Sequence, residues 1–178
     1  MPDESGHAGP MDVSELSLRF PGAPGYLNTA SIGLPPEATI GAMAEALTRW
    51  QAGEAHAPEY DAPVAEARRV FADLLSVPVD WVAVGSQVSA LVGLAATVLV
   101  PGARVLAPEG EFTSVVFPFL VRDDLHVDFV PLEALADSID PWTDMVAFSA
   151  VQSADGRVAD LDGIAASAAS NETLTLSL

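Results

Sequence analysis

Short β-rich runs alternate with helical runs through the second half of this 178-residue chain, and that alternation restricts the fold more than any other feature. The expected strands cover residues 82–84, 104–107, 127–130, 145–150 and 173–178. The expected helices lie between them at 86–100, 112–120, 132–139 and 161–169. Strands separated by helices of this length need crossover connections, which favour parallel pairing with helices on both faces of the sheet. We therefore predict an α/β fold with three layers and a mostly parallel sheet.

The first half of the chain has a different pattern. Residues 1–24 carry Pro, Gly, Asp, Glu and Ser without apolar periodicity, which predicts a flexible lead-in. Apolar residues spaced three and four apart then predict one helix from Pro35 to near Gly53 and a second at 62–76. Residues 25–178 are expected to form a single domain. Within its predicted helix at 112–120, Pro118 is expected to cause a break.

Charge and composition exclude several classes of function. Acidic residues outnumber basic ones by 25 to 7, and the net charge of −18 repels phosphate backbones and anionic lipids. No apolar run approaches the ~20 residues that span a bilayer, and no secretory signal is visible. We expect a cytoplasmic protein that binds neither nucleic acid nor membranes. The chain has no cysteine, and its three histidines show no metal-binding spacing, so no metal site is predicted.

The chain contains no lysine, since all seven cationic side chains are arginine. A lysine amine can condense with an aldehyde to form a Schiff base, whereas the permanently protonated guanidinium of arginine cannot. No residue of the chain is therefore expected to act as a covalent amine catalyst.

The segment AVGSQVSAL, residues 83–91, is the strongest candidate for a binding site. A strand runs into Gly85, the chain turns, and a helix is expected to begin between Ser86 and Ser89. Unpaired backbone N–H groups at a helix start suit an anion such as a phosphate ester. The alternative is a plain helix cap, because the segment has neither a Walker lysine nor a Rossmann glycine triplet.

The segment EGEFTSVVFPF, residues 109–119, is the second candidate. Phe112 follows a predicted strand, where its ring could lie over an aromatic ligand. The alternative for Phe112 is a place in the hydrophobic core.

The segment SAVQSADGRVADLDGI, residues 149–164, is the third candidate. Gln152 and Ser153 follow a strand at its carboxyl end, which is the edge where open α/β sheets bind ligands. The alternative is a turn, with Asp155 and Gly156 closing it and Asp160 capping the next helix.

Together with YLNTASIGLPP near the start, these segments resemble, in this order, the class V aminotransferase family. That family comprises fold-type-I pyridoxal-phosphate enzymes such as cysteine desulfurases and isopenicillin N epimerase-like proteins. The resemblance covers residues 26 to 176 but only the N-terminal part of the family's length. It implies an incomplete PLP-transferase large domain, pyridoxal 5′-phosphate as cofactor, an amino acid as the substrate of the parent activity, and a homodimer or other self-association.

The resemblance also implies roles for individual residues. The cofactor phosphate would be held by Ser86, Gln87 and Val88, with Ser89 as an alternate. Phe112 would stack on the pyridine ring, and Gln152 or Ser153 would lie near the ring hydroxyl. The substrate pocket would be bordered by the stretch that includes Asn28, Ala30 and Ser31.

Family members continue beyond the strand that aligns with 174–176 to an Asp that pairs with the pyridinium nitrogen, and then to the Schiff-base lysine. This sequence ends at Leu178. We therefore expect a truncated family member that is inactive as given, with marginal stability and a tendency to self-associate through exposed strand edges and apolar helix faces. The alternatives are a non-catalytic binding or regulatory module, half of a two-chain enzyme, or an unrelated acidic α/β domain.

Overall fold

The computed structural model describes residues 12–29 and 32–178 of the chain. These residues belong to two compact units, Met1–Val82 and Ala83–Leu178, and each unit is described here by itself. In the part of the chain that the structure describes, no helix combines the length and the apolarity needed to cross a bilayer.

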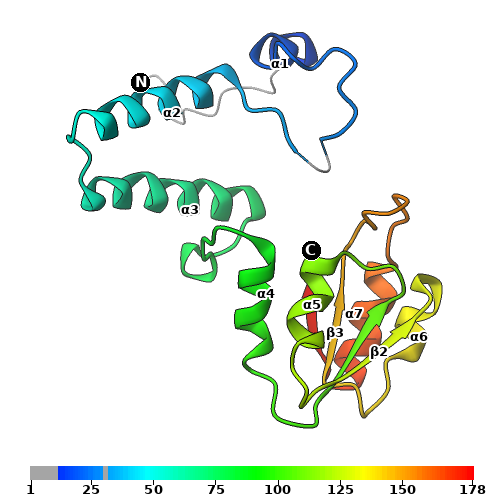
Figure 1. The fold of residues 1–178 in the computed structure, drawn as a ribbon. Helices are drawn as coiled ribbons and strands as arrows, with labels where there is room; N and C mark the ends of the chain where they lie inside the picture. The colour runs from blue at the N-terminus through cyan, green and yellow to red at the C-terminus, as the bar shows by residue number, and fades with distance from the viewer. Residues whose placement is uncertain (1–11, 30–31) are drawn as a thin grey trace, which may run out of the picture. The chain divides into compact units, whose positions relative to one another are not determined.

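The first unit is helical (Figure 1). Its elements are α1 (Val13–Arg19), α2 (Glu37–Gln51), the 3-10 helix η1 (Ala57–Tyr60), α3 (Asp61–Leu75) and the 3-10 helix η2 (Val79–Trp81). The two predicted amphipathic helices, α2 and α3, are confirmed. The expected lead-in contains α1, which the apolar spacing did not indicate. Arg68 joins α3 to the segment after it, since its Nε donates to the carbonyl oxygen of Val82 at 2.7 Å.

The second unit is an α/β sandwich built on a four-stranded sheet (Figure 1). Its elements are α4 (Val88–Ala96), β1 (Arg104–Pro108), α5 (Thr113–Leu120), β2 (His126–Val130), η3 (Leu132–Ala134), α6 (Leu135–Ser138), β3 (Met145–Phe148), α7 (Leu161–Ser170) and β4 (Leu174–Ser177). The strand order is β2-β1-β3-β4, and each neighbouring pair is parallel. The predicted fold class is confirmed.

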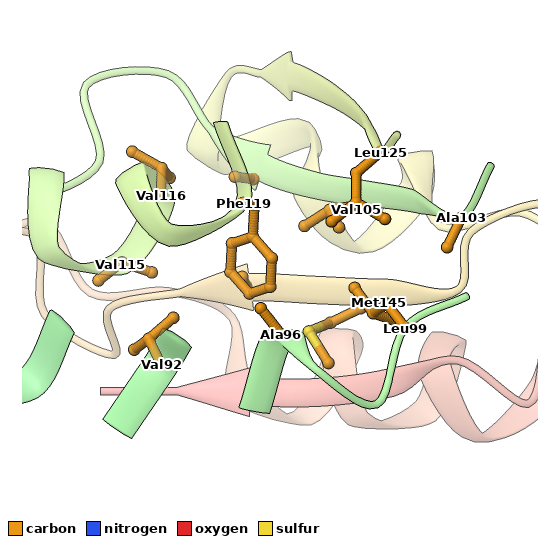
Figure 2. Close-up of a cluster of buried hydrophobic side chains, with 12 residues drawn as sticks. Val92, Ala96, Leu99, Ala103, Val105, Val115, Val116, Phe119, Leu125 and Met145 are labelled. Atoms are coloured by element: carbon orange, nitrogen blue, oxygen red, sulfur yellow. The ribbon is translucent and has the colours of Figure 1, made fainter. Parts of the chain in front are cut away.

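Helices cover both faces of this sheet, as successive strand residues show. Val105 and Met145 belong to one hydrophobic core, to which α4 and α5 contribute Val92 and Phe119 (Figure 2). The residues that alternate with these along the strands belong to a second core with α6 and α7. They are Leu106 on β1 and Val146 and Phe148 on β3. Because successive side chains on a strand point to opposite faces, the two cores lie on the two sides of the sheet. The three layers expected from the sequence are present.

The order of the strands reverses between β1 and β3. From β1 the chain passes through α5 to β2 on one side, and it then returns through α6 to β3 on the other side of β1. In open parallel sheets, ligands bind at the carboxyl ends of the strands where the order reverses in this way. The loops that follow Pro108 and Phe148 therefore mark the position at which a site is expected.

The strand predicted at 82–84 is not formed. Val82 has an extended backbone, with φ of −102° and ψ of 121°, but no described strand pairs with this segment. An extended segment becomes a strand only when another strand satisfies its N–H and C=O groups.

Two predicted helices differ from the prediction in extent. The helix expected at 86–100 is α4, which ends at Ala96, where Arg122 Nη1 donates to the carbonyl oxygens of Ala96 (2.7 Å) and Leu99 (3.2 Å). A side chain distant in the sequence thus satisfies carbonyls at the end of this helix. The helix expected at 132–139 is divided into η3 and α6.

The break predicted at Pro118 is absent, because α5 continues through this residue to Leu120. Pro118 removes one backbone hydrogen bond, and it does so only two residues before the helix ends. Val115 and Phe119, buried on the inner face of α5, anchor the helix to the sheet on both sides of the proline. Tertiary packing therefore overrides the local preference.

Candidate functional site

Glu111 connects the two loops at the switch point of the sheet. It follows β1, is only 8% exposed, and accepts four hydrogen bonds. Oε1 accepts from the N–H of Phe112 (2.8 Å) and from Ser149 Oγ (2.6 Å), and Oε2 accepts from the N–H of Ser149 (2.8 Å) and from Gln152 Nε2 (2.9 Å). Because Ser149 and Gln152 follow β3, one carboxylate ties together the carboxyl ends of the two central strands.

The hydrogen bonds keep the Glu111 carboxylate charged. Burial by itself raises the pKa of Glu111, but the hydrogen bonds from Ser149, Gln152 and the backbone of Phe112 outweigh burial, so the net pKa lies below its ordinary value. At neutral pH the side chain is therefore an ionised group that can only accept hydrogen bonds.

This lowered pKa predicts a dependence of stability on pH. A carboxyl group whose pKa is lowered in the folded state contributes stability that is complete above its unfolded-state pKa, and this stability is lost as the pH falls through the folded-state pKa. We expect the free energy of unfolding of the wild type to fall more steeply with acidification than that of Glu111→Gln. Urea titrations at a series of pH values below 6 measure this difference, and the surface carboxylates common to both proteins cancel. Equal pH dependence in the two proteins would contradict the role of Glu111.

Gln152 lies where the sequence predicted, at the carboxyl end of β3, and it is 3% exposed. Its Nε2 donates to Glu111 and also to the carbonyl oxygen of Ser149 at 3.2 Å. Its backbone N–H donates to the carbonyl of Arg157, and its own carbonyl accepts from Gly156. Among the described residues, Oε1 is the one polar atom of Gln152 with no partner, and it is not a fully enclosed atom. The side chain therefore presents its carbonyl oxygen.

The turn considered as the alternative for this segment is also present. Gly156 adopts a positive φ of 77°, and Asp155 accepts from the N–H of Arg157 at 3.0 Å. Asp160 caps α7 by accepting from the N–H of Gly163 at 3.0 Å. Ser153 is exposed within this turn. The segment is thus both a turn and part of the edge at which the site was predicted.

The start of α4 lies level with Glu111 and Phe112. Val92 on α4 packs beside Val115 on α5, and one turn later Ala96 packs beside Phe119 (Figure 2). Equal steps along both helices mean that α4 and α5 run in parallel and side by side. About one turn before Val92 is Val88, the first residue of α4, and about one turn before Val115 is Phe112, the N-cap of α5, which directly follows Glu111. The start of α4, which belongs to the predicted phosphate-binding segment, therefore lies at the same edge of the sheet as the Glu111 network, the hydrogen bonds that join Glu111 to Phe112, Ser149 and Gln152.

The first turn of α4 offers backbone donors. Gln87 is its N-cap, with an extended backbone (φ −163°, ψ 151°) and no side-chain cap. In the described residues, the N–H groups of Val88, Ser89 and Ala90 have no hydrogen-bond partner, and the first bond of the helix is from Leu91 N to Gln87 O at 3.3 Å. These donors point out of the start of the helix.

Gly85 allows the preceding turn to lie against this first turn of α4. A Cβ atom at this position would come within 2.6 Å of Leu91 Cδ2, so a larger residue would displace the Leu91 side chain. Ser86 and Gln87 are exposed, and Ser89 is half-buried.

Phe112 is the N-cap of α5, and its side chain is 50% exposed. Its backbone N–H is held by Glu111, so its ring stands next to the network and remains open to solvent. Two described pockets of the second unit lie elsewhere, one along Leu132 and Arg157 and the other along Leu99 and Asn171. The pocket along Leu132 includes Arg157, Val158 and Asp160 of the third predicted segment, but neither pocket is lined by Ser86, Phe112 or Gln152.

The predicted substrate residues belong to the first unit. Asn28 belongs to the first unit, is exposed, and accepts at its backbone oxygen from the N–H of Ile32 at 3.1 Å. Ala30 and Ser31 lie outside the described residues. The substrate role of this stretch stays a prediction. Across residues 12–29 and 32–178, no group of three or more His, Asp or Glu side chains is arranged to hold a metal ion.

Glu111 is not among the site residues predicted from the sequence. The signal was an acidic residue directly before Phe112 and just after a predicted strand, in the segment EGEF. Glu109 in the same segment is exposed, and the sequence does not distinguish the two carboxylates. Ser149 and Gln152, which donate to Glu111, lie 38 and 41 residues away, which is why the local pattern did not reveal its role.

No family model and no curated protein matches this chain. Solved structures do match its fold. A cysteine desulfurase, CsdA from Escherichia coli, aligns with a TM-score of 0.73 at 20% identity over 94% of this chain and 48% of its own. The cysteine desulfurase of Thermococcus onnurineus aligns with a TM-score of 0.75 at 16% identity over 96% of this chain and 48% of its own.

A mutant of C-DES with glycine covalently linked to its PLP cofactor aligns with a TM-score of 0.74 at 17% identity, over 90% of this chain and 47% of its own. The chain therefore spans about half the length of these structures. At these identities the comparisons show a shared fold, and that fold is the one that the resemblance to class V aminotransferases implied.

Proposed function

We propose that this chain is a cofactor-binding part of a class V aminotransferase-like protein that takes pyridoxal 5′-phosphate at the carboxyl edge of its sheet. The observation that carries the proposal is the unpartnered set of N–H donors at the start of α4, level with Glu111 and Phe112 at the switch point. The PLP cofactor of C-DES, a protein of the same fold, supports it. The parent activity would act on an amino acid substrate.

The residues at this edge suit the cofactor. The N–H groups of Val88 and Ser89, with the hydroxyl of Ser86, would hold the phosphate, because the start of a helix favours a negative group. The half-exposed ring of Phe112 would stack on the pyridine, and Gln152 would contact a polar substituent of the ring. When bound, the cofactor supplies an electron sink for reactions at the α-carbon of an amino acid. The chain itself binds and orients the cofactor.

The chain has no lysine, and this observation favours a second candidate function. A non-catalytic module, or one half of a two-chain enzyme, would bind the cofactor without a covalent bond to it. In either case residues 25–178 would form the N-terminal part of a PLP-transferase-like large domain. The protein would be located in the cytoplasm.

Substitution of Val88 by proline tests the phosphate site. Val88 is the first residue of α4 and follows an extended residue, so proline fits this position and removes only the N–H donor. We expect the affinity for pyridoxal phosphate to fall roughly tenfold, since a hydrogen bond to a charged group is lost. Val88→Ala keeps the N–H and should bind as the wild type does. Fluorescence titration gives both dissociation constants.

Borohydride treatment completes this experiment. We expect no reduced lysine adduct, and any adduct should map to the N-terminal amine by mass spectrometry. If wild type, Val88→Pro and Val88→Ala all bind with the same affinity, the phosphate does not use the start of α4. A stable adduct at an internal residue would contradict the non-covalent mode.

We also propose that the chain self-associates, as its apolar surface suggests. The apolar face predicted for α2 is exposed in the structure and includes Leu47 (57%) and Trp50 (71%). We expect the wild type to sediment as a dimer or larger species, and Leu47→Glu to shift the distribution toward monomer because a charge resists burial. Glu45→Gln on the same helix is the control. A wild type that sediments only as monomer would contradict the proposal.

A further inference from the structure

The Glu111 network leaves one polar atom unused. Gln152 is only 3% exposed, yet its Oε1 has no hydrogen-bond partner among the described residues. Both hydrogens of Nε2 are taken, one by Glu111 Oε2 at 2.9 Å and the other by Ser149 O at 3.2 Å. Because buried polar groups are normally hydrogen-bonded, this free acceptor can accept a hydrogen bond from a ligand.

The direction of this amide is set by Glu111. A carboxylate accepts hydrogen bonds and cannot donate, so the NH₂ group of Gln152 must face it. The opposite orientation of the amide would place Oε1 of Gln152 against Oε2 of Glu111, and two hydrogen-bond acceptors in contact repel each other. The Glu111 carboxylate is itself held in place by Ser149, because it accepts hydrogen bonds from the N–H and from the hydroxyl of Ser149.

We propose that Glu111 is a positioning residue that fixes the Gln152 amide, so that the site presents an acceptor and selects a phosphorylated aromatic ring bearing an amine over one bearing an aldehyde. This inference rests on the proposed function, because it assumes that such a ring binds at this edge. An ammonium group donates to Oε1 and is attracted by the nearby carboxylate. An aldehyde oxygen is itself an acceptor and gains neither interaction.

The test compares pyridoxamine 5′-phosphate with pyridoxal 5′-phosphate on the full chain by isothermal titration calorimetry. The two ligands share the ring and the phosphate and differ at one substituent. We expect the amine to bind roughly threefold to tenfold more tightly, the range that one net hydrogen bond gives. Binding of both forms with equal affinity, or tighter binding of the aldehyde, would overturn the inference while leaving the proposed function intact. Failure of both ligands to bind would instead overturn the proposed function.

Two variants assign the selectivity to these residues. Glu111→Gln replaces the carboxylate by an isosteric amide that no longer dictates the orientation of Gln152, and Gln152→Met removes the acceptor at similar length. In both, the ratio of the two affinities should fall to near one. A residue that only supports the fold would weaken both ligands alike and leave the ratio unchanged, and that outcome would refute the positioning role.

Glu109→Gln is the matched control. Glu109 lies two residues from Glu111, carries the same charge, and is exposed. Its substitution changes the net charge as Glu111→Gln does, but it should leave the ratio of affinities at the wild-type value. A collapsed ratio in Glu109→Gln would mean that net charge alone sets the preference. Since the wild-type ratio is measured without any substitution, the inference can fail even if Glu111→Gln does not fold.

Discussion

Replacing Glu111 with alanine is expected to lower the free energy of unfolding by about 3–4 kcal/mol, because several buried donors lose their acceptor at once. Two of these donors, the hydroxyl of Ser149 and the amide of Gln152, belong to buried side chains, and the others are the backbone N–H groups of Ser149 and Phe112. Each donor would remain at the carboxyl ends of β1 and β3 without a substitute partner. Urea unfolding followed by circular dichroism measures the loss.

Two further substitutions serve as reference variants for the destabilisation expected of Glu111→Ala. Glu111→Gln keeps one acceptor oxygen, so its cost should be smaller, about 1–2 kcal/mol. Glu109→Ala removes an exposed carboxylate from the same loop and should change stability by no more than about 0.5 kcal/mol. If Glu111→Ala were as stable as Glu109→Ala, the four hydrogen bonds would not hold the loops together in solution.

Replacing Phe119 with alanine is the second large change that we expect. Phe119 is 0% exposed and lies between α5 and the sheet, close to Ala96 and Val105 (Figure 2). Truncating a buried phenylalanine removes its transfer free energy and leaves a cavity, which together cost about 3–5 kcal/mol. The loss should appear as a lower urea midpoint with an unchanged slope, if the denatured state is unaffected.

Phe117 on the same helix provides the control for Phe119. Its side chain is 58% exposed, so Phe117→Ala should change the free energy of unfolding by about 0.5 kcal/mol or less. The two variants remove the same atoms from one helix, so helix propensity and chain composition cancel in the comparison. Equal destabilisation by both substitutions would show that α5 does not pack on the sheet through Phe119.

Features that depend on local pattern could be predicted from the sequence alone. Apolar spacing identified α2 and α3, because periodicity records which face of an element is buried, and the alternation of short strands with helices indicated α7 and the parallel α/β class. Gln152 and Phe112 could be placed at the edge of the sheet because each comes a few residues after the end of a predicted strand. Their proximity follows from the rule that parallel strands end at one edge.

Features that depend on partners distant in the chain are seen only in the folded structure. Residues 82–84 have an extended backbone at Val82, but whether they form a strand depends on a neighbour that no local pattern supplies. The carbonyls at the end of α4 are satisfied by Arg122, 26 residues beyond Ala96. Glu111 is buried and Glu109 is exposed because Ser149 and Gln152 donate hydrogen bonds to Glu111. A carboxylate is stable in a buried position only when folding brings it enough hydrogen-bond donors.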